Sequence, residues 1–124
     1  MTDYLTLADV LAIHADLIER YGGSAGLLDA GLLESALFRP QTGYYADLIE
    51  EAAALWQSLG QNYAFVDGKK RISFAATYTF LAINGVTVRA SADEAYAFIS
   101  GRYEAGSFRF EELTKWLRAN SGKL

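Results

Sequence analysis

The chain has 124 residues, of which 52% are hydrophobic, and its formal net charge is −4 at pH 7. This length predicts a single domain over residues 1–124, and the negative charge argues against direct nucleic-acid binding, because nucleic-acid-binding domains are usually basic along a whole face. The sequence has no cysteine, no secretion signal and no apolar run near the ~20 residues that span a bilayer, which excludes disulfides and predicts a cytoplasmic protein without a membrane partner.

Three helices are expected in the first half of the chain. Thr6 is a good N-cap for the first helix, whose apolar residues recur at helical spacing until the glycine pair at 22–23 stops it. A second helix is expected after Asp29 and must end before Pro40, because the residue ahead of a proline disfavours helical backbone. A third helix is expected over residues 47–61.

Residues 41–45 lack helical periodicity. They follow Pro40 and join Gly43 to Tyr44 and Tyr45, two aromatic residues that favour strands. A short hairpin or extended flap fits this composition, and a surface turn that packs both tyrosines fits it equally well.

The second half of the chain is also helical. A central helix over residues 72–83 is apolar on most of its faces, which predicts that other helices surround it. Residues 91–94 form a capping box for a fifth helix, and Ser107 is a candidate cap for a sixth. We therefore expect an all-α fold, a compact helical domain around the central helix, with a short flap or hairpin at residues 41–45.

The run at residues 62–71, at the start of the central helix, is rich in groups that bind phosphate. The first turn of a helix has N–H groups without intrahelical partners and carries the positive end of the macrodipole. Gly68 allows close approach of the backbone, and Lys69, Lys70 and Arg71 add three positive charges at the same point. Because cations at a helix start are unfavourable unless an anion or an acidic partner binds there, we expect a phosphate or nucleotide site with Arg71 as its clamp.

This run resembles the signature H-x-F-x-D-G-N-K-R of the Fic superfamily, in its death-on-curing (Doc) branch. The matching positions are Phe65, Asp67, Gly68, Lys70 and Arg71. Tyr63 stands at the position of the family's catalytic histidine, and Lys69 stands at the position of its asparagine. Further similarity runs from His14 through residues 31–36 to Trp116, so the resemblance covers nearly the whole chain and implies the Fic fold.

The resemblance implies the toxin half of a toxin–antitoxin pair, which in active members uses ATP to phosphorylate elongation factor Tu. It implies a Phd-like antitoxin that blocks the site and a flap at residues 41–45 that docks the target by strand addition. It also carries catalytic roles over to Tyr63, Asp67 and Arg71, with Mg²⁺ held by Asp67. The alternative role for Asp67 is an acidic N-cap of the central helix.

Tyr63 and Lys69 leave more than one function open. Free tyrosine titrates at about 10, and nearby cations favour the phenolate while burial opposes it, so Tyr63 is either a base or a protonated phenol that hydrogen-bonds phosphate. The Lys69 ammonium can pair with Asp67 or neutralise phosphate charge that Mg²⁺ would otherwise cover, so nucleotide binding should depend less on magnesium. The sequence predicts a Doc-like toxin with impaired or altered activity, or alternatively a catalytically inactive regulator that binds nucleotide or a protein partner. An AMP-transferring enzyme ranks third, because Lys70 stands where that branch usually carries glycine.

His14 is the only histidine and lies on the apolar stripe of the first helix, far in sequence from residues 62–71. A buried histidine with a structural role is favoured over a catalytic one. A single histidine also cannot form a two-histidine metal site.

Overall fold

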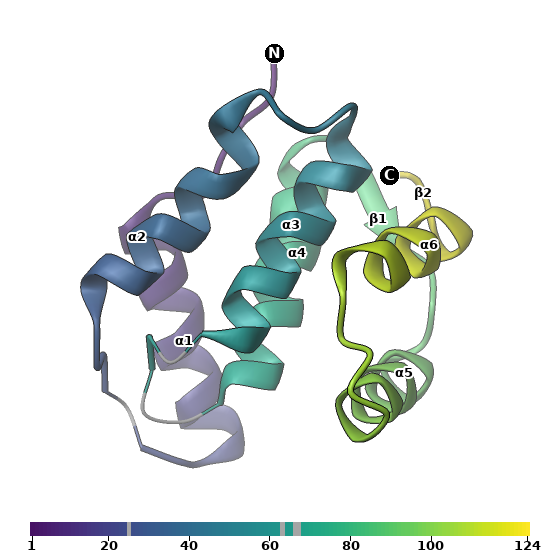
Figure 1. Ribbon diagram of the computed structural model, residues 1–124. Coiled ribbons are helices and arrows are strands. Elements are labelled where there is room, and N and C mark those ends of the chain that lie inside the picture. Colours follow the sequence, from purple (N-terminus) through teal and green to yellow (C-terminus); the bar gives the residue numbers. More distant parts are fainter. Residues whose placement is uncertain (25, 63, 66–67) are drawn as a thin grey trace.

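The structure is a computed structural model that describes residues 1–24, 26–62, 64–65 and 68–124. These residues form six α-helices, one short 3-10 helix and two short strands (Figure 1). In chain order the elements are α1 (Leu7–Tyr21), α2 (Ala30–Phe38), η1 (Arg39–Thr42), α3 (Leu48–Gln61), α4 (Lys69–Ile83), β1 (Val86–Val88), α5 (Ala92–Glu104), α6 (Phe110–Asn120) and β2 (Ser121–Lys123). The predicted all-α fold is confirmed. In the part of the chain described, no helix is long and apolar enough to cross a membrane.

Four helices begin within one residue of the position that the sequence predicts, and each has a side-chain cap. Each capping side chain accepts a hydrogen bond from the backbone N–H group three residues further on: Thr6 for α1, Asp29 for α2, Asp47 for α3 and Ser91 for α5. These bonds satisfy N–H groups that the helix itself leaves unpaired. At its other end, α1 stops at Gly22, where φ is 82°.

Two helix starts differ from the sequence prediction. α4 begins at Lys69 rather than at residue 72, because Gly68 adopts left-handed backbone (φ 79°) and serves as its N-cap. α6 begins after Arg109, and Ser107 does not cap it. The backbone N–H of Arg109 donates to the Ser107 carbonyl over 2.8 Å, and this tight turn delays the start of α6.

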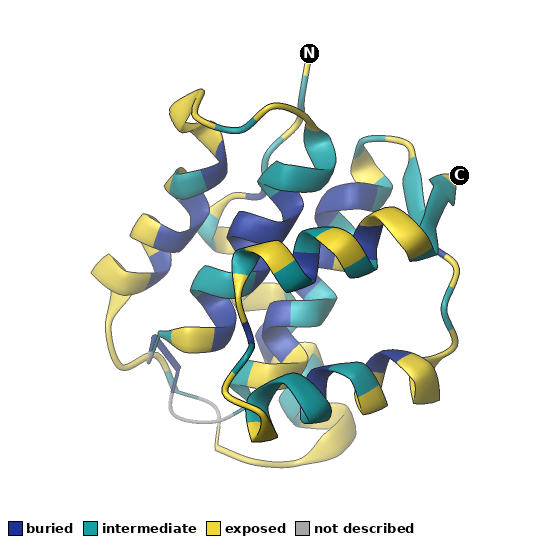
Figure 2. Ribbon diagram, turned by 45° about the vertical axis from the view of Figure 1, so that its right-hand side comes forward, coloured by how far each residue is buried: buried dark blue, intermediate teal, exposed yellow. Residues whose placement is uncertain are grey.

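α3 and α4 lie side by side at the centre of the fold, where α1 packs on α4 and both α2 and α6 pack on α3 (Figures 1 and 2). Trp56 of α3 is fully buried at the middle of the core. Its ring centroid lies 5.4 to 6.0 Å from the centroids of Phe74, Phe98, Phe108 and Trp116. These rings come from α4, α5, α6 and the α5–α6 connection, so one aromatic cluster holds the second half of the chain together. The predicted central helix is confirmed, and α3 shares its position.

The strand pair of the fold joins β1 to β2 rather than lying at residues 41–45. The two strands are antiparallel, with Thr87 opposite Gly122, and α5 and α6 separate them in sequence. Residues 39–42 instead form η1, in which Pro40 occupies the first turn, where its missing N–H costs no hydrogen bond. Gly43 then reverses the chain with left-handed backbone (φ 81°).

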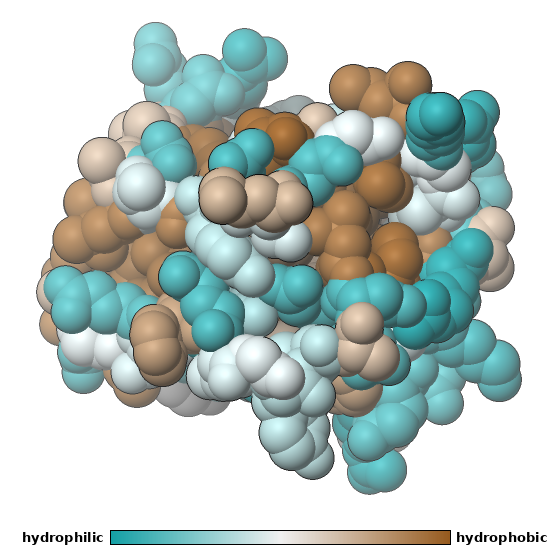
Figure 3. Space-filling model, turned by 90° about the horizontal axis from the view of Figure 1, so that it is seen from above, coloured by the Kyte–Doolittle hydropathy of each residue, from teal (hydrophilic) through white to brown (hydrophobic). Residues whose placement is uncertain are grey.

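The α2–α3 connection is a surface turn that packs one of its two tyrosines. The Tyr45 ring lies 5.5 Å from the ring of Phe110, whereas Tyr44 is 85% exposed. Figure 3 looks down on this end of the molecule, where apolar residues gather in areas separated by polar ones. Phe38, at the end of α2, is also largely exposed.

Candidate anion-binding site at the start of helix α4

The first turn of α4 carries Lys69, Lys70 and Arg71 and contains no acidic residue. Its N-cap, Gly68, has no side chain to accept a hydrogen bond from the helix. The first turn of a helix exposes N–H groups without intrahelical acceptors, and the macrodipole adds positive charge there. The three cations therefore add to a positive potential that the described residues of the turn do not offset. This arrangement suits a phosphate or another anion.

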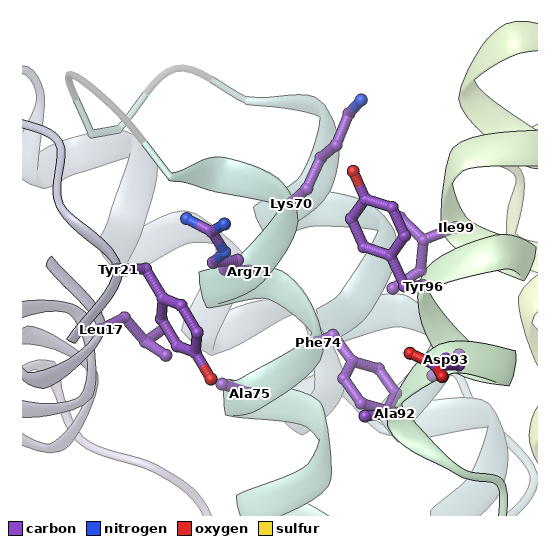
Figure 4. Close-up of a pocket in the computed structure, with 11 residues that line it drawn as sticks. Leu17, Tyr21, Lys70, Arg71, Phe74, Ala75, Ala92, Asp93, Tyr96 and Ile99 are labelled. Carbon is purple, nitrogen blue, oxygen red and sulfur yellow. The ribbon is translucent and has the colours of Figure 1, made fainter.

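The cations lie on both sides of the helix axis. The Arg71 guanidinium lies over the ring of Tyr21, at the end of α1, with 4.5 Å between the guanidinium carbon and the ring centroid (Figure 4). The Lys70 ammonium lies 4.8 Å from the ring centroid of Tyr103 in α5, and the Lys69 ammonium lies 6.0 Å from the same centroid. These distances fit cation–π contacts. Helices α1 and α5 thus position the charges of α4.

The described part of the loop that precedes α4 is held against α2 and the α1–α2 connection. The Asn62 side chain accepts from the backbone N–H of Ala64 (3.1 Å) and donates to the Leu32 carbonyl (3.2 Å). The Ala64 carbonyl in turn accepts from the backbone N–H of Leu28 over 2.7 Å. Phe65 pairs with Leu27 in an isolated β-bridge and is buried. The Asn62 side chain and the backbone of residues 64–65 therefore attach this loop to the N-terminal half of the fold.

His14 lies against this loop, although it is far away in sequence. It is 4% exposed, and its imidazole stacks on the ring of Phe65 with 4.0 Å between centroids. A Cβ atom on Gly68 would lie 3.7 Å from His14 Nε2, which is ordinary contact distance. The predicted burial of His14 is confirmed, and its structural role stays a prediction. The packing of α1 on α4 brings this side chain to the site.

Tyr103 is a further residue at the site that the sequence did not indicate. Its hydroxyl donates a hydrogen bond to the carbonyl of Gly60, at the end of α3. Its ring stacks on Phe108, with 4.4 Å between centroids and 18° between planes. Burial raises the pKa of the Tyr103 phenol to about 12, so it remains a hydrogen-bond donor at neutral pH. No local sequence signal relates Tyr103 to the start of α4.

A pocket of about 370 Å³ opens beside the cations, between α1, α4 and α5. Leu17, Phe74 and Ile99 give it an apolar lining (Figure 4). Lys70 and Arg71 lie at one end of this lining. The pocket therefore offers apolar contact next to a strongly cationic helix start. Pockets of this size and composition bind small molecules and apolar side chains of partner proteins.

The predicted phosphate-binding residues lie close together in the structure. Gly68, Lys69, Lys70 and Arg71 lie together at the start of α4. Tyr63 and Asp67, the predicted catalytic residues ahead of them, lie outside the described residues. Among the side chains that are described, no cluster of three histidine, aspartate or glutamate residues could hold a metal ion. The role of Asp67 toward Mg²⁺ stays a prediction.

The predicted docking residues Gly43, Tyr44 and Tyr45 lie at the other end of α3. They precede the first residue of α3, whereas the loop at residues 62–68 follows its last residue. Because α3 has 14 residues, its two ends lie roughly 20 Å apart. The Tyr45 hydroxyl accepts a hydrogen bond of 2.7 Å from Arg39 Nε, which directs this side chain toward the body of the molecule. Tyr44 is the member of the pair that a partner can reach.

The fold and the site together agree with a known family. A model of the Fic/DOC family matches residues 4–81, from just ahead of α1 to the last turn of α4. This match includes α1 and the whole start of α4, and it ends ahead of α5. The chain belongs to the Fic/DOC family.

Two relatives define the branch. The chain is 45% identical over 98 residues to "Toxin Doc" of Mycolicibacterium smegmatis, a match that covers 75% of this chain and 73% of the relative. It is 30% identical over 89 residues to "Protein kinase doc" of Escherichia phage P1, with 68% of this chain and 71% of the relative covered. The predicted membership of the Doc branch is confirmed.

Proposed function

We propose that this chain is a Doc-like toxin of a type II toxin–antitoxin module, derived from an ATP-dependent kinase of elongation factor Tu, whose activity Tyr63 and Lys69 impair or alter. The observation that carries this proposal is the first turn of α4, which has three cations and no acidic residue. Such a helix start is suited to the phosphates of ATP. The names of the two relatives, a toxin and a protein kinase, agree with it.

Arg71 is the proposed phosphate clamp. Its guanidinium makes no hydrogen bond or ion pair with any described residue, and its carbon lies 4.5 Å from the centroid of the Tyr21 ring. A cation–π contact of this kind uses none of the N–H donors of the guanidinium in hydrogen bonds. The contact with Tyr21 therefore leaves these donors able to bind two phosphate oxygens.

Catalysis is the part of the family function that this chain has altered. A general base contributes roughly 10² to 10⁴ to the rate, and it works best when its pKa lies near the ambient pH. A tyrosine titrates at about 10, so Tyr63 is a poor replacement for histidine in proton abstraction. The Lys69 ammonium supplies positive charge beside the phosphates, and we propose that ATP binding depends less on Mg²⁺ than it does with asparagine at this position.

Substitution of Arg71 tests the nucleotide site. Calorimetric titration should show that Arg71→Ala weakens ATP binding by at least about tenfold, because hydrogen bonds between charged groups contribute about 1.5 to 3 kcal/mol. Titration with and without Mg²⁺ should give similar affinities for the wild type. Arg20→Ala is the matched control, since Arg20 is exposed on α1 and pairs only with Asp16 among the described residues. Equal affinities of wild type and Arg71→Ala, or no binding by either, would contradict the nucleotide site.

A catalytically inactive regulator that binds nucleotide or a protein partner is the second candidate function. Tyr63 at the position of the catalytic histidine favours it, because such a protein would retain the phosphate-binding cations and lose the base. Transfer of phosphate from ATP to elongation factor Tu, measured with a variant that restores the family's histidine, separates the two functions.

A Phd-like antitoxin is the proposed partner, and Tyr44 is the proposed anchor for a partner segment. Exposed aromatic side chains commonly anchor protein interfaces. We expect Tyr44→Ala to weaken capture of the co-expressed antitoxin in a pull-down without changing thermal stability, because Tyr44 is 85% exposed. Tyr96→Ala is the matched control, an exposed tyrosine on α5. If only the Tyr96 variant loses capture, Tyr44 is not the anchor, and the partner docks at the pocket between α1, α4 and α5, which Tyr96 lines.

A further inference from the structure

We propose that Tyr103 is a positioning residue of the anion-binding site, whose ring holds the Lys70 ammonium beside the start of α4 while its hydroxyl fixes the end of α3. The inference deepens the proposed function, since it rests on anion binding at α4. It assigns to the end of α5 a role in a site that is otherwise built from α1, α3 and α4.

The first observation is the contact between Tyr103 and the lysines. The Lys70 ammonium lies 4.8 Å from the Tyr103 ring centroid, and the Lys69 ammonium lies 6.0 Å from it. A cation within about 6 Å of a ring centroid is attracted to the electron-rich ring face. Lys70 is an exposed residue, so without the ring its long side chain would sample many rotamers in solvent. The ring therefore restricts Lys70 to positions near the helix start.

The second observation is that the Tyr103 ring is itself held in place. One face stacks on Phe108, which is buried, and this leaves the opposite face for the cation. The hydroxyl donates to the carbonyl of Gly60. Gly60 is required for this approach, because a Cβ atom there would lie 2.4 Å from Phe108 Cε1 and 2.7 Å from the Tyr103 hydroxyl. A ring held by this stacking contact and by its hydroxyl can fix the ammonium that rests on it.

The third observation is where these contacts fall in the chain. Gly60 lies in the last turn of α3, and Lys70 lies in the first turn of α4. Tyr103 thus contacts the chain on both sides of the loop that carries the family signature. Loss of the ring should free Lys70, and loss of the hydroxyl alone should affect the end of α3 without freeing Lys70.

Two variants separate these effects. Tyr103→Phe keeps the ring and removes the hydroxyl, whereas Tyr103→Leu removes the ring and keeps an apolar side chain against Phe108. In the ligand-free protein, NMR should show the Lys70 Cε protons shifted upfield by the ring current in wild type and Tyr103→Phe, and shifted back in Tyr103→Leu. Absence of this shift in the wild type would overturn the proposal, whether or not the leucine variant folds.

ATP titration then tests whether the held ammonium matters for binding. Tyr103→Leu should weaken ATP binding about two- to fivefold, the range expected for an exposed cation–π contact, and Tyr103→Phe should bind within about twofold of wild type. In a Lys70→Met background, Tyr103→Leu should have no further effect, because a residue that acts through Lys70 cannot act without it. An equal loss in both backgrounds would overturn the positioning role. A wild type that binds no ATP would contradict the proposed function separately, and the ring-current shift would still decide whether Tyr103 positions Lys70.

Discussion

The double variant Tyr63→His, Lys69→Asn should transfer phosphate from ATP to elongation factor Tu roughly 10² to 10⁴ times faster than the wild type, because it restores a general base. The variant rebuilds the family signature around residues that are unchanged in this chain. The described neighbours of position 63 are anchored, since Asn62 and Ala64 bond to α2 and to the α1–α2 connection.

The measurement is transfer of radiolabel from ATP to purified elongation factor Tu, together with growth arrest on expression. Tyr63→His alone separates the contribution of the base from that of Lys69. If Arg71 clamps the phosphates, adding Arg71→Ala to the double variant should abolish the transfer of radiolabel. A wild type as active as the double variant would make Tyr63 a working catalyst. A silent double variant that folds and binds ATP would favour the inactive regulator, because the target site would then have diverged too.

Trp56→Ala should lower the free energy of unfolding by about 3 to 5 kcal/mol, the range for removal of a large buried aromatic side chain. Trp56 is 0% exposed and contacts rings from α4, α5, α6 and the α5–α6 connection. Its removal leaves a cavity where these elements meet, and the elements cannot all move inward to fill it. The measurement is the midpoint of urea unfolding at an unchanged denaturant slope.

Trp56→Phe refines the same test. The indole Nε1 of Trp56 is buried and has no hydrogen-bond partner among the described residues. Phenylalanine at this position removes volume without breaking a hydrogen bond to those residues, so it should cost less than half as much as alanine. Tyr44→Ala is the surface control and should stay within about 0.5 kcal/mol of wild type. A loss below about 1 kcal/mol for Trp56→Ala would contradict the aromatic cluster as the centre of the core.

Local chemistry in the sequence determined the helices and the family. Thr6 and Ser91 cap helices as predicted, because a cap depends on a side chain and a backbone N–H group three residues apart. The sequence also predicts the cationic start of α4, because all of its charges lie within one helical turn and are therefore adjacent in the chain. Where two local interpretations were equally good, as at residues 41–45, the pattern alone could not choose between them. The structure has a surface turn there, in which Gly43 adopts left-handed backbone and Tyr45 packs on Phe110.

The tertiary structure decided which distant side chains complete the site. His14 stacks on Phe65, Tyr21 lies under Arg71, and Tyr103 joins the carbonyl of Gly60 to the ammonium of Lys70. Each of these contacts joins segments that are far apart in the chain, and none leaves a periodic or spaced pattern in the sequence. Helical periodicity shows which face of a helix is buried, but it does not show which helix covers that face or which residue meets which. The sequence by itself therefore determined the elements, the family and the cations at α4, and only the packing of α1 and α5 beside α4 decided what surrounds those cations.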